Sequence, residues 1–321
     1  MAASVHKSPV AVENGTAEKN PKREQTKKLN QATAGRRRSR LPDDHALLLA
    51  SHVTERDRRI AVDCYEHHVL TTDQISRLYF PKPRGATARL QTLYDLRVLD
   101  RFRPSRKRGE GTLPYHWVLD EGGALLVADH KGIEQSQLHY SRADALNLAA
   151  SRNLTHHVEG NEFFVRLAVE ASTAGGALSE WYGVRTLARL LGGVAVPDGY
   201  GVLNLPDRDP LHLLLELDRG TESSRVLQKK ATSYAEILPH STLRDLSPLV
   251  IFAVPSDRRA QTASSAVSHS GAPVAVITWS AASRSSLLRA VIARLVEPLS
   301  PSRPVDDLSV VPKAPAGFHE H

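Results

Sequence analysis

The sequence of 321 residues contains a single cysteine, Cys64. One cysteine cannot form an internal disulfide, and it excludes a zinc site built from several cysteines. The chain also lacks an apolar run long enough to span a bilayer, and its N-terminus lacks the apolar core of a secretory signal peptide. These absences predict a cytoplasmic protein that has no membrane partner.

The motifs of several common enzyme classes are absent as well. There is no G-x-x-x-x-G-K-[ST] loop for NTP hydrolysis and no G-x-S-x-G elbow for a serine hydrolase. Gly192-Gly193 precedes a predicted strand instead of opening a helix, which argues against dinucleotide binding. Aromatic residues make up only 5% of the chain, so the core must consist mainly of Leu, Val and Ala.

Positive charge is plentiful and unevenly placed. The chain has a net charge of +7, and residues 1–40, with ten Lys or Arg and three Glu, carry that whole excess. Residues 56–118 hold thirteen basic and seven acidic side chains, so the balance elsewhere is negative. A basic tail followed by a basic segment is typical of a polyanion-binding protein, although a solubilising tail is the alternative. We expect disordered tails over residues 1–45 and 298–321.

The pattern of residues 46–132 predicts a winged helix-turn-helix. Three helical segments are expected, the second capped by Thr71 or Thr72. Two extended runs follow, Arg101–Ser105 and Leu113–Leu119, and the basic, Gly-containing stretch RKRGEGT joins them as a wing. In such a domain the third helix enters the major groove and the wing reaches phosphates or the minor groove. The alternative is a winged helix that contacts only proteins.

The expected DNA contacts lie on the third helix and at the tip of the wing. They are Arg84, Thr87, Arg89, Gln91, Arg106, Lys107 and Arg108.

After a connector over residues 133–150, residues 151–297 alternate between helical and extended patterns. A long helix near Ser151–Thr173 comes first. The expected strands are Leu178–Tyr182, Val194–Leu203, His212–Asp218, Leu249–Pro255 and Pro273–Trp279, and the last two are almost wholly apolar. The alternation predicts a largely parallel, three-layer α/β domain.

Polar side chains gather at the ends of two of these strands. Glu216 and Asp218 lie two residues apart and therefore point to the same side, and Asp198 opens the preceding strand. Carboxylates on adjacent strands form the hard oxygen site that Mg²⁺ prefers. Lys230 and Tyr234 are four residues apart and share a helix face. A lysine close to the carboxylates could position a water nucleophile. The alternative is two salt bridges at the strand end, with Arg219 or Arg225 as the cation.

These motifs resemble those of a known family. The residues are His157, Asn161, Asp198, Glu216, Asp218, Arg219, Gly220, Thr221, Glu222, Lys230 and Tyr234, in the order H-x-x-x-N-x-F, PDG, LELDRGTE and K-x-x-x-Y. Together with the basic winged helix, they resemble the replication-relaxation family of actinobacterial plasmids and chromosomes. The second half is similar to the PD-(D/E)xK nuclease-like superfamily, in its restriction-endonuclease-like fold. The resemblance covers roughly residues 56–279.

The resemblance implies a DNA-binding protein of plasmid or mobile-element replication, with DNA and other replication or conjugation proteins as partners. An active site would use Asp198, Glu216 and Asp218 with Mg²⁺ to nick DNA, with His157, Asn161, Glu162 and Tyr234 as accessory residues. The usual lysine position of the superfamily holds Asp218, so Lys230 is expected to replace it. The alternative is a non-enzymatic replication or transcription factor with an inactive nuclease-like domain.

Overall fold

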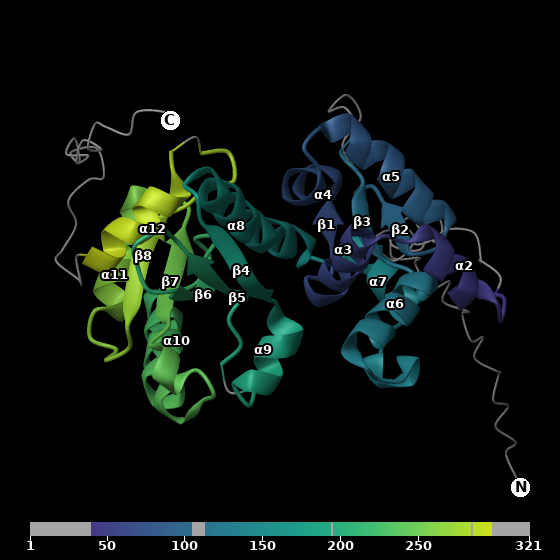
Figure 1. Ribbon diagram of the computed structural model, residues 1–321. Helices are drawn as coiled ribbons and strands as arrows, with labels where there is room; N and C mark the ends of the chain where they lie inside the picture. Colours follow the sequence, from purple (N-terminus) through teal and green to yellow (C-terminus); the bar gives the residue numbers. More distant parts are fainter. Residues whose placement is uncertain (1–39, 105–112, 194, 284, 297–321) are drawn as a thin grey trace, which may run out of the picture. The chain divides into compact units, whose positions relative to one another are not determined.

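The computed structural model describes residues 40–104, 113–193, 195–283 and 285–296, which belong to one compact unit (Figure 1). Most of the two predicted tails therefore lies outside the described residues. So do the wing-tip residues Arg106, Lys107 and Arg108. In the part of the chain that is described, no helix is long and apolar enough to cross a membrane.

The N-terminal region, residues 40–131, combines helices with a small antiparallel sheet. Its strands lie in the order β1-β3-β2. The elements are α2 (His45–His52), α3 (Glu55–Glu66), β1 (Leu70–Thr71), α4 (Thr72–Tyr79), α5 (Pro83–Asp95), β2 (Leu99–Phe102), β3 (His116–Leu119) and α6 (Glu121–Lys131). Ile60, Leu90 and Trp117 belong to a core cluster to which all these elements contribute, and Phe102 of β2 and Val118 of β3 belong to a second, smaller one.

Local sequence explains where the helices of this region begin. Thr54 and Thr71 are N-caps, and each forms a reciprocal capping box with the third helical residue, Asp57 or Gln74. Pro83 occupies the first turn of α5, where its missing N–H leaves no hydrogen bond unmade. The three predicted helices correspond to α3, α4 and α5, and the paired strands β2 and β3 follow them; α2 and the short strand β1 were not predicted.

The predicted connector carries structure of its own. It contains a 3₁₀ turn (Gln135–Leu138), the short helix α7 (Arg142–Asn147) and a second 3₁₀ turn (Leu148–Ala150). Leu138 and Leu146 are buried against the N-terminal region, so this segment packs as part of the fold.

The C-terminal region, residues 154–296, is a five-stranded sheet with helices on both faces (Figure 1). Helices α8 and α12 pack on one face, and α9, α10 and α11 pack on the other. The elements are α8 (Leu154–Thr173), β4 (Ala177–Tyr182), α9 (Val184–Leu190), β5 (Gly199–Asn204), β6 (Leu211–Leu217), α10 (Ser224–Ile237), β7 (Leu249–Val254), α11 (Asp257–Val267), β8 (Val274–Thr278) and α12 (Leu287–Val296). The chain thus has the predicted α/β class.

The expectation of a largely parallel sheet was wrong. In the order β4-β5-β6-β7-β8, the first two pairings are antiparallel and the last two are parallel. The segment between β5 and β6 is too short to contain a crossover helix, so it turns the chain back antiparallel. Strand β5 also begins later than predicted, at Gly199, directly after Pro197-Asp198.

Candidate functional site

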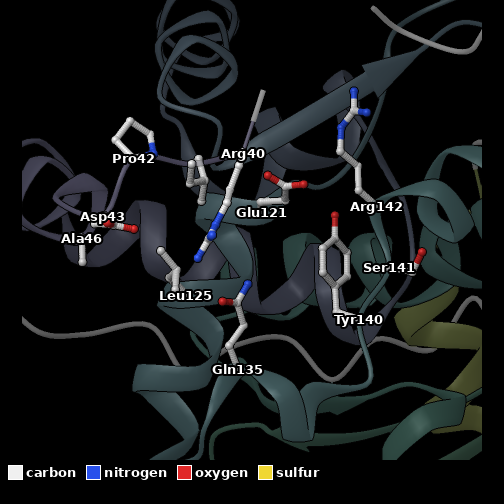
Figure 2. A pocket seen from close by; sticks show the side chains of 11 residues that line it. Arg40, Pro42, Asp43, Ala46, Glu121, Leu125, Gln135, Tyr140, Ser141 and Arg142 are labelled. Atoms are coloured by element: carbon white, nitrogen blue, oxygen red, sulfur yellow. The ribbon is translucent and has the colours of Figure 1, made fainter. Parts of the chain in front are cut away.

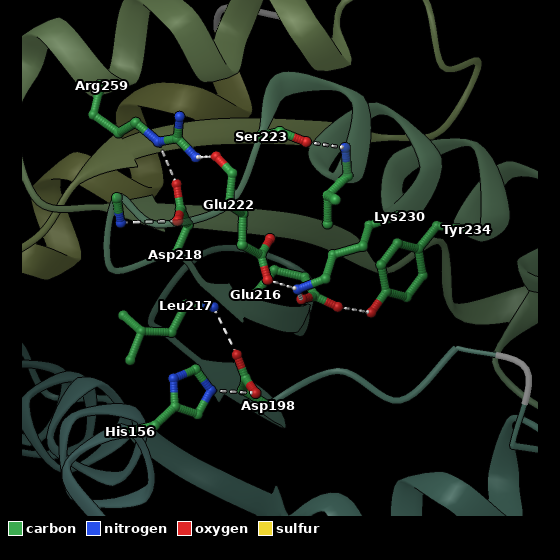
Figure 3. A network of polar contacts seen from close by, with 12 residues as sticks. His156, Asp198, Glu216, Leu217, Asp218, Glu222, Ser223, Lys230, Tyr234 and Arg259 are labelled. Atoms are coloured by element: carbon green, nitrogen blue, oxygen red, sulfur yellow. Dashed lines mark hydrogen bonds and ion pairs between the residues drawn. The ribbon is translucent and has the colours of Figure 1, made fainter. Parts of the chain in front are cut away.

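The strand register brings Asp198 and Glu216 together. Gly199 pairs with Leu215 in the antiparallel ladder of β5 and β6, and the Asp198 N–H donates to the Leu215 carbonyl at 2.8 Å. Asp198 therefore lies opposite Glu216, on the same side of the sheet (Figure 3). Leu213, Leu215 and Leu217 face the opposite core, so alternation along β6 turns Glu216 toward α10.

Glu216 is buried and held by two side chains of α10. Lys230 Nζ donates to one carboxylate oxygen at 2.9 Å, and the Tyr234 hydroxyl donates to the other (Figure 3). Burial, together with the nearby negative charge of Asp198, raises the pKa of Glu216 to about 7 despite these two donors. The carboxyl group can therefore exchange a proton near neutral pH.

Asp198 has a histidine partner. His156, in the first turn of α8, places Nε2 2.7 Å from one Asp198 oxygen, and the Leu217 N–H donates to the other at 2.7 Å. The hydrogen bond to Asp198 raises the pKa of His156, although burial opposes this. A protonated His156 is thereby stabilised next to the carboxylate.

Asp218 has a different environment. It lies just after β6 and is 2% exposed, with the Arg259 guanidinium on one oxygen and the Gly220 N–H on the other at 2.8 Å. Arg259 also donates to the Glu222 carbonyl, so it joins the two ends of the turn that follows β6. The cation beside Asp218 is thus Arg259, and Arg219 pairs with Glu159 at 3.0 Å instead.

Glu222 completes the cluster. One of its oxygens accepts from Lys230 at 2.8 Å, and the other, Oε2, is buried without a hydrogen-bond partner in the described part of the chain. Burial lowers the pKa of Lys230, but the charges and hydrogen bonds of Glu216 and Glu222 outweigh it, and the pKa lies above its ordinary value. Lys230 is therefore a firmly protonated bridge between two carboxylates.

Three predicted accessory residues lie away from this cluster. His157 contacts the His68 ring, with centroids 5.0 Å apart. The Asn161 side chain donates to the carbonyls of His67 and Val69, and Glu162 accepts from Arg77 and Gln74. Asn161 and Glu162 thus fasten α8 to the N-terminal region. Tyr234 is the accessory residue that contacts a clustered carboxylate.

The predicted DNA-contacting residues on α5 differ in exposure and in whether another side chain already binds them. Arg84 and Thr87 are exposed, and Gln91 donates to Asp95 at 2.9 Å. Arg89 instead pairs with Asp57, which is fully buried. Burial raises the pKa of Asp57, but the hydrogen bonds from Arg89 and Thr54 outweigh it and leave the pKa below its ordinary value. The Arg89 guanidinium therefore fastens α5 to α3.

The number and type of oxygen donors in the cluster match those that commonly bind Mg²⁺. Mg²⁺ in proteins is commonly bound by one or two carboxylates, with water and substrate phosphates completing its shell. Asp198 and Glu216 provide two carboxylates in register, and Glu222, whose Oε1 accepts from the Lys230 that also binds Glu216, has a second oxygen, Oε2, without a partner in the described part of the chain. Among the described residues, no group of three or more His, Cys, Asp or Glu side chains is arranged to hold a metal.

A cavity in the described part of the chain lies away from this cluster. It has a volume of about 790 Å³ and is lined by residues of the N-terminal region and of the segment that follows α6 (Figure 2). Two of its charged residues, Glu121 and Arg142, are already in ion pairs with Arg97 and Asp100. None of the clustered carboxylates lines it.

The sequence interpretation chose His157 of the pair His156-His157, missed Arg259, and included Glu222 only through the family resemblance. Adjacent histidines point in directions about 100° apart on a helix, and only the helix phase decides which one reaches Asp198. Arg259 is 41 residues from Asp218 in sequence, and no local pattern joins them.

The comparisons with known proteins gave one result. A family model described as replication-relaxation matches residues 63–246, more than half of the chain. Searches of curated proteins and of solved structures each found no match. The matched residues run from α3 through α10 and include the Asp198–Glu216 cluster with Lys230 and Tyr234.

Proposed function

The chain belongs to the replication-relaxation family, which indicates a role in plasmid or mobile-element replication, and we propose that it binds and nicks DNA. The N-terminal region would bind duplex DNA as a winged helix. The cluster of Asp198, Glu216 and Lys230 would cleave one strand with Mg²⁺. A single-strand break would relax a supercoiled plasmid.

DNA binding is supported by the charge and form of the N-terminal region. Exposed basic residues lie at the start of α5, with Lys82 as its N-cap and Arg84 in its first turn, and Thr87 follows one turn later. A helix that presents such residues beside a two-stranded wing has the form that enters a major groove. Exposed basic side chains there would neutralise phosphates and supply most of the affinity.

Cleavage is supported by one observation, the placement of Lys230 2.9 Å from Glu216 while Asp198 faces Glu216 across the ladder. Asp198 and Glu216 would hold Mg²⁺, which supplies positive charge to a phosphodiester and favours a nucleophilic water. Lys230 would orient that water and stabilise the charge that develops on the phosphate. The attacking water would form a new P–O bond and lose a proton to the solvent, the P–O bond to the leaving oxygen would break, and that oxygen would take a proton from the solvent. Asp218, which is bound to Arg259, would stabilise the fold and would not bind the metal.

A second function is favoured by a specific observation. Each clustered carboxylate already has an internal donor: His156 for Asp198, Lys230 for Glu216 and Arg259 for Asp218. Such a closed network can stabilise a fold without chemistry. The protein would then be a non-enzymatic replication or transcription factor that holds DNA and a protein partner.

Incubation with supercoiled plasmid and Mg²⁺ distinguishes the two functions. The nickase predicts conversion of supercoiled plasmid to open circles by the wild type, loss of conversion in Asp198→Asn and Glu216→Gln, and unchanged DNA affinity in both variants. Asp209→Asn, at an exposed loop position before β6, is the matched control and should keep full activity. If all four proteins bind and none nicks, the non-enzymatic function is correct.

A further inference from the structure

The arginines of the N-terminal region fall into two groups. Five of the ten described there, Arg58, Arg59, Arg77, Arg89 and Arg97, pair with Asp or Glu, and Arg40, Arg56 and Arg84 do not. Arg101 and Arg103, at the end of β2, have no carboxylate partner among the residues that the structure describes. In the part of the chain that the structure describes, no ion pair therefore neutralises their charge.

Aromatic rings hold these two arginines in place. The Arg101 guanidinium carbon lies 4.4 Å from the ring centroid of Tyr94 and 4.2 Å from that of Tyr115. The Arg103 guanidinium carbon lies 3.7 Å from the Tyr115 centroid. Tyr115 thus contacts both arginines, and Tyr94 links the first of them to α5.

The strand register explains this arrangement. Arg101 pairs with Trp117 and Phe102 with His116, so continuation of the ladder places Arg103 opposite Tyr115. Arg101 and Arg103 are two residues apart and share one side of the sheet, while Phe102 is buried on the other. Arg103 is exposed, and Arg101 and Tyr115 are half-buried. The two arginines therefore form one surface at the base of the wing, beside α5.

A stacked guanidinium suits a phosphate. Stacking covers the flat faces of the group, while the N–H donors at its edge remain available for two parallel hydrogen bonds. Because the ring already restricts the side chain, less conformational freedom is lost when an anion binds. An arginine without an acidic neighbour also has no internal ion pair to break.

We propose that Arg101 and Arg103, held by Tyr94 and Tyr115, bind backbone phosphates of duplex DNA at the base of the wing. This inference rests on the proposed DNA binding and adds a contact that differs from the α5 positions and the wing tip. In this arrangement Arg89 contributes to the fold, and the wing-base arginines contribute to affinity. They fix how the wing lies against the duplex when α5 is in the groove.

Salt dependence of binding tests the inference. The affinity of the full chain for a fluorescent 30-base-pair duplex is measured by anisotropy at several KCl concentrations, for wild type and for Arg101→Gln/Arg103→Gln. Each lost phosphate contact reduces the slope of log K against log salt by about 0.9, so the double variant should lose about 1 to 2. Arg103→Gln alone, at an exposed strand end, should lose about 1 even if the double variant folds poorly.

Two further variants separate charge from stacking. Tyr115→Leu keeps both arginines, so its slope should stay near that of wild type while its affinity falls severalfold. Arg244→Gln removes one positive charge from an exposed turn of the C-terminal region and should leave the slope unchanged.

The outcomes distinguish this inference from the function on which it rests. If wild type binds duplex DNA and Arg103→Gln keeps the same slope and affinity, the wing-base contact is wrong and DNA binding stands. If wild type fails to bind any duplex at low salt, the proposed DNA binding fails and this inference fails with it.

Discussion

Asp63 offers a direct test of the electrostatics of the N-terminal region. It lies in α3, where the Tyr79 hydroxyl donates to its carboxylate. Burial, with a contribution from the charge of Glu66, raises the pKa of Asp63 to about 6, from an ordinary value of 3.8, although the Tyr79 hydroxyl opposes the shift. The change Asp63→Asn keeps the shape of the side chain and an oxygen that can accept from Tyr79, and it removes the charge.

The direction of the effect follows from proton binding. A carboxyl whose pKa is raised on folding binds its proton more tightly in the folded state. Its contribution to stability is complete below about pH 3.8 and is lost as the pH rises through about 6. A shift from 3.8 to about 6 corresponds to about 3 kcal/mol in the unscreened limit. Because Asp63 is only half-buried by surface area, we expect about 1–2 kcal/mol after solvent screening.

Urea unfolding at a series of pH values from 4 to 8 measures this contribution. The free energy of unfolding of Asp63→Asn minus that of wild type should rise by about 1–2 kcal/mol between pH 4 and pH 7 and then level off. Glu216 titrates in both proteins, so its contribution cancels in the difference. A difference that is constant with pH would show that Asp63 has an ordinary pKa in the folded protein and would refute the reasoning.

Three other substitutions test packing and pairing. In Gly199→Ala, the added Cβ would lie 2.4 Å from the ring of Phe164, so urea unfolding should show a loss of about 1–3 kcal/mol; no loss would mean that the ring moves aside freely. Tyr234→Phe removes a donor from buried Glu216 and should cost about 1–3 kcal/mol in the same assay, and an unchanged stability would contradict the hydrogen bond. Arg89→Ala should lower the melting temperature, while the DNA affinity of the folded protein stays within about twofold. A tenfold loss of affinity, about 1.4 kcal/mol, would show that Arg89 does contact DNA.

Much of the candidate site could be predicted because its parts lie close together in sequence. Lys230 and Tyr234 are four residues apart, a spacing that places two side chains on one helix face, and both contact Glu216. Asp198 and Glu216 flank a short antiparallel connection, whose register sets them opposite each other. Apolar runs likewise predicted β7 and β8 to within one or two residues.

The remaining features depend on contacts between distant segments. Arg89 has the sequence context of an exposed helix residue, yet the buried Asp57 on another helix binds it. The partner of Asp218 could not be chosen among several arginines, since Arg259 reaches it only after α11 packs beside α10. The alternating elements predicted parallel strands, whereas the order β4-β5-β6 is set by a short connection and by chain reversal. Ion pairs and strand direction depend on contacts between segments that are far apart in the sequence, and local sequence patterns do not predict them.

The central claim is that Asp198 and Glu216 hold a divalent cation. Binding of Mn²⁺, a paramagnetic substitute for Mg²⁺, can be counted directly from the loss of its free electron-spin signal in the absence of DNA. The account predicts saturable binding by wild type and by the control Asp209→Asn, and loss of that binding in Asp198→Asn and Glu216→Gln with all proteins folded. No saturable binding by wild type, or equal binding by all four proteins, would contradict the claim and leave the carboxylates as part of the fold.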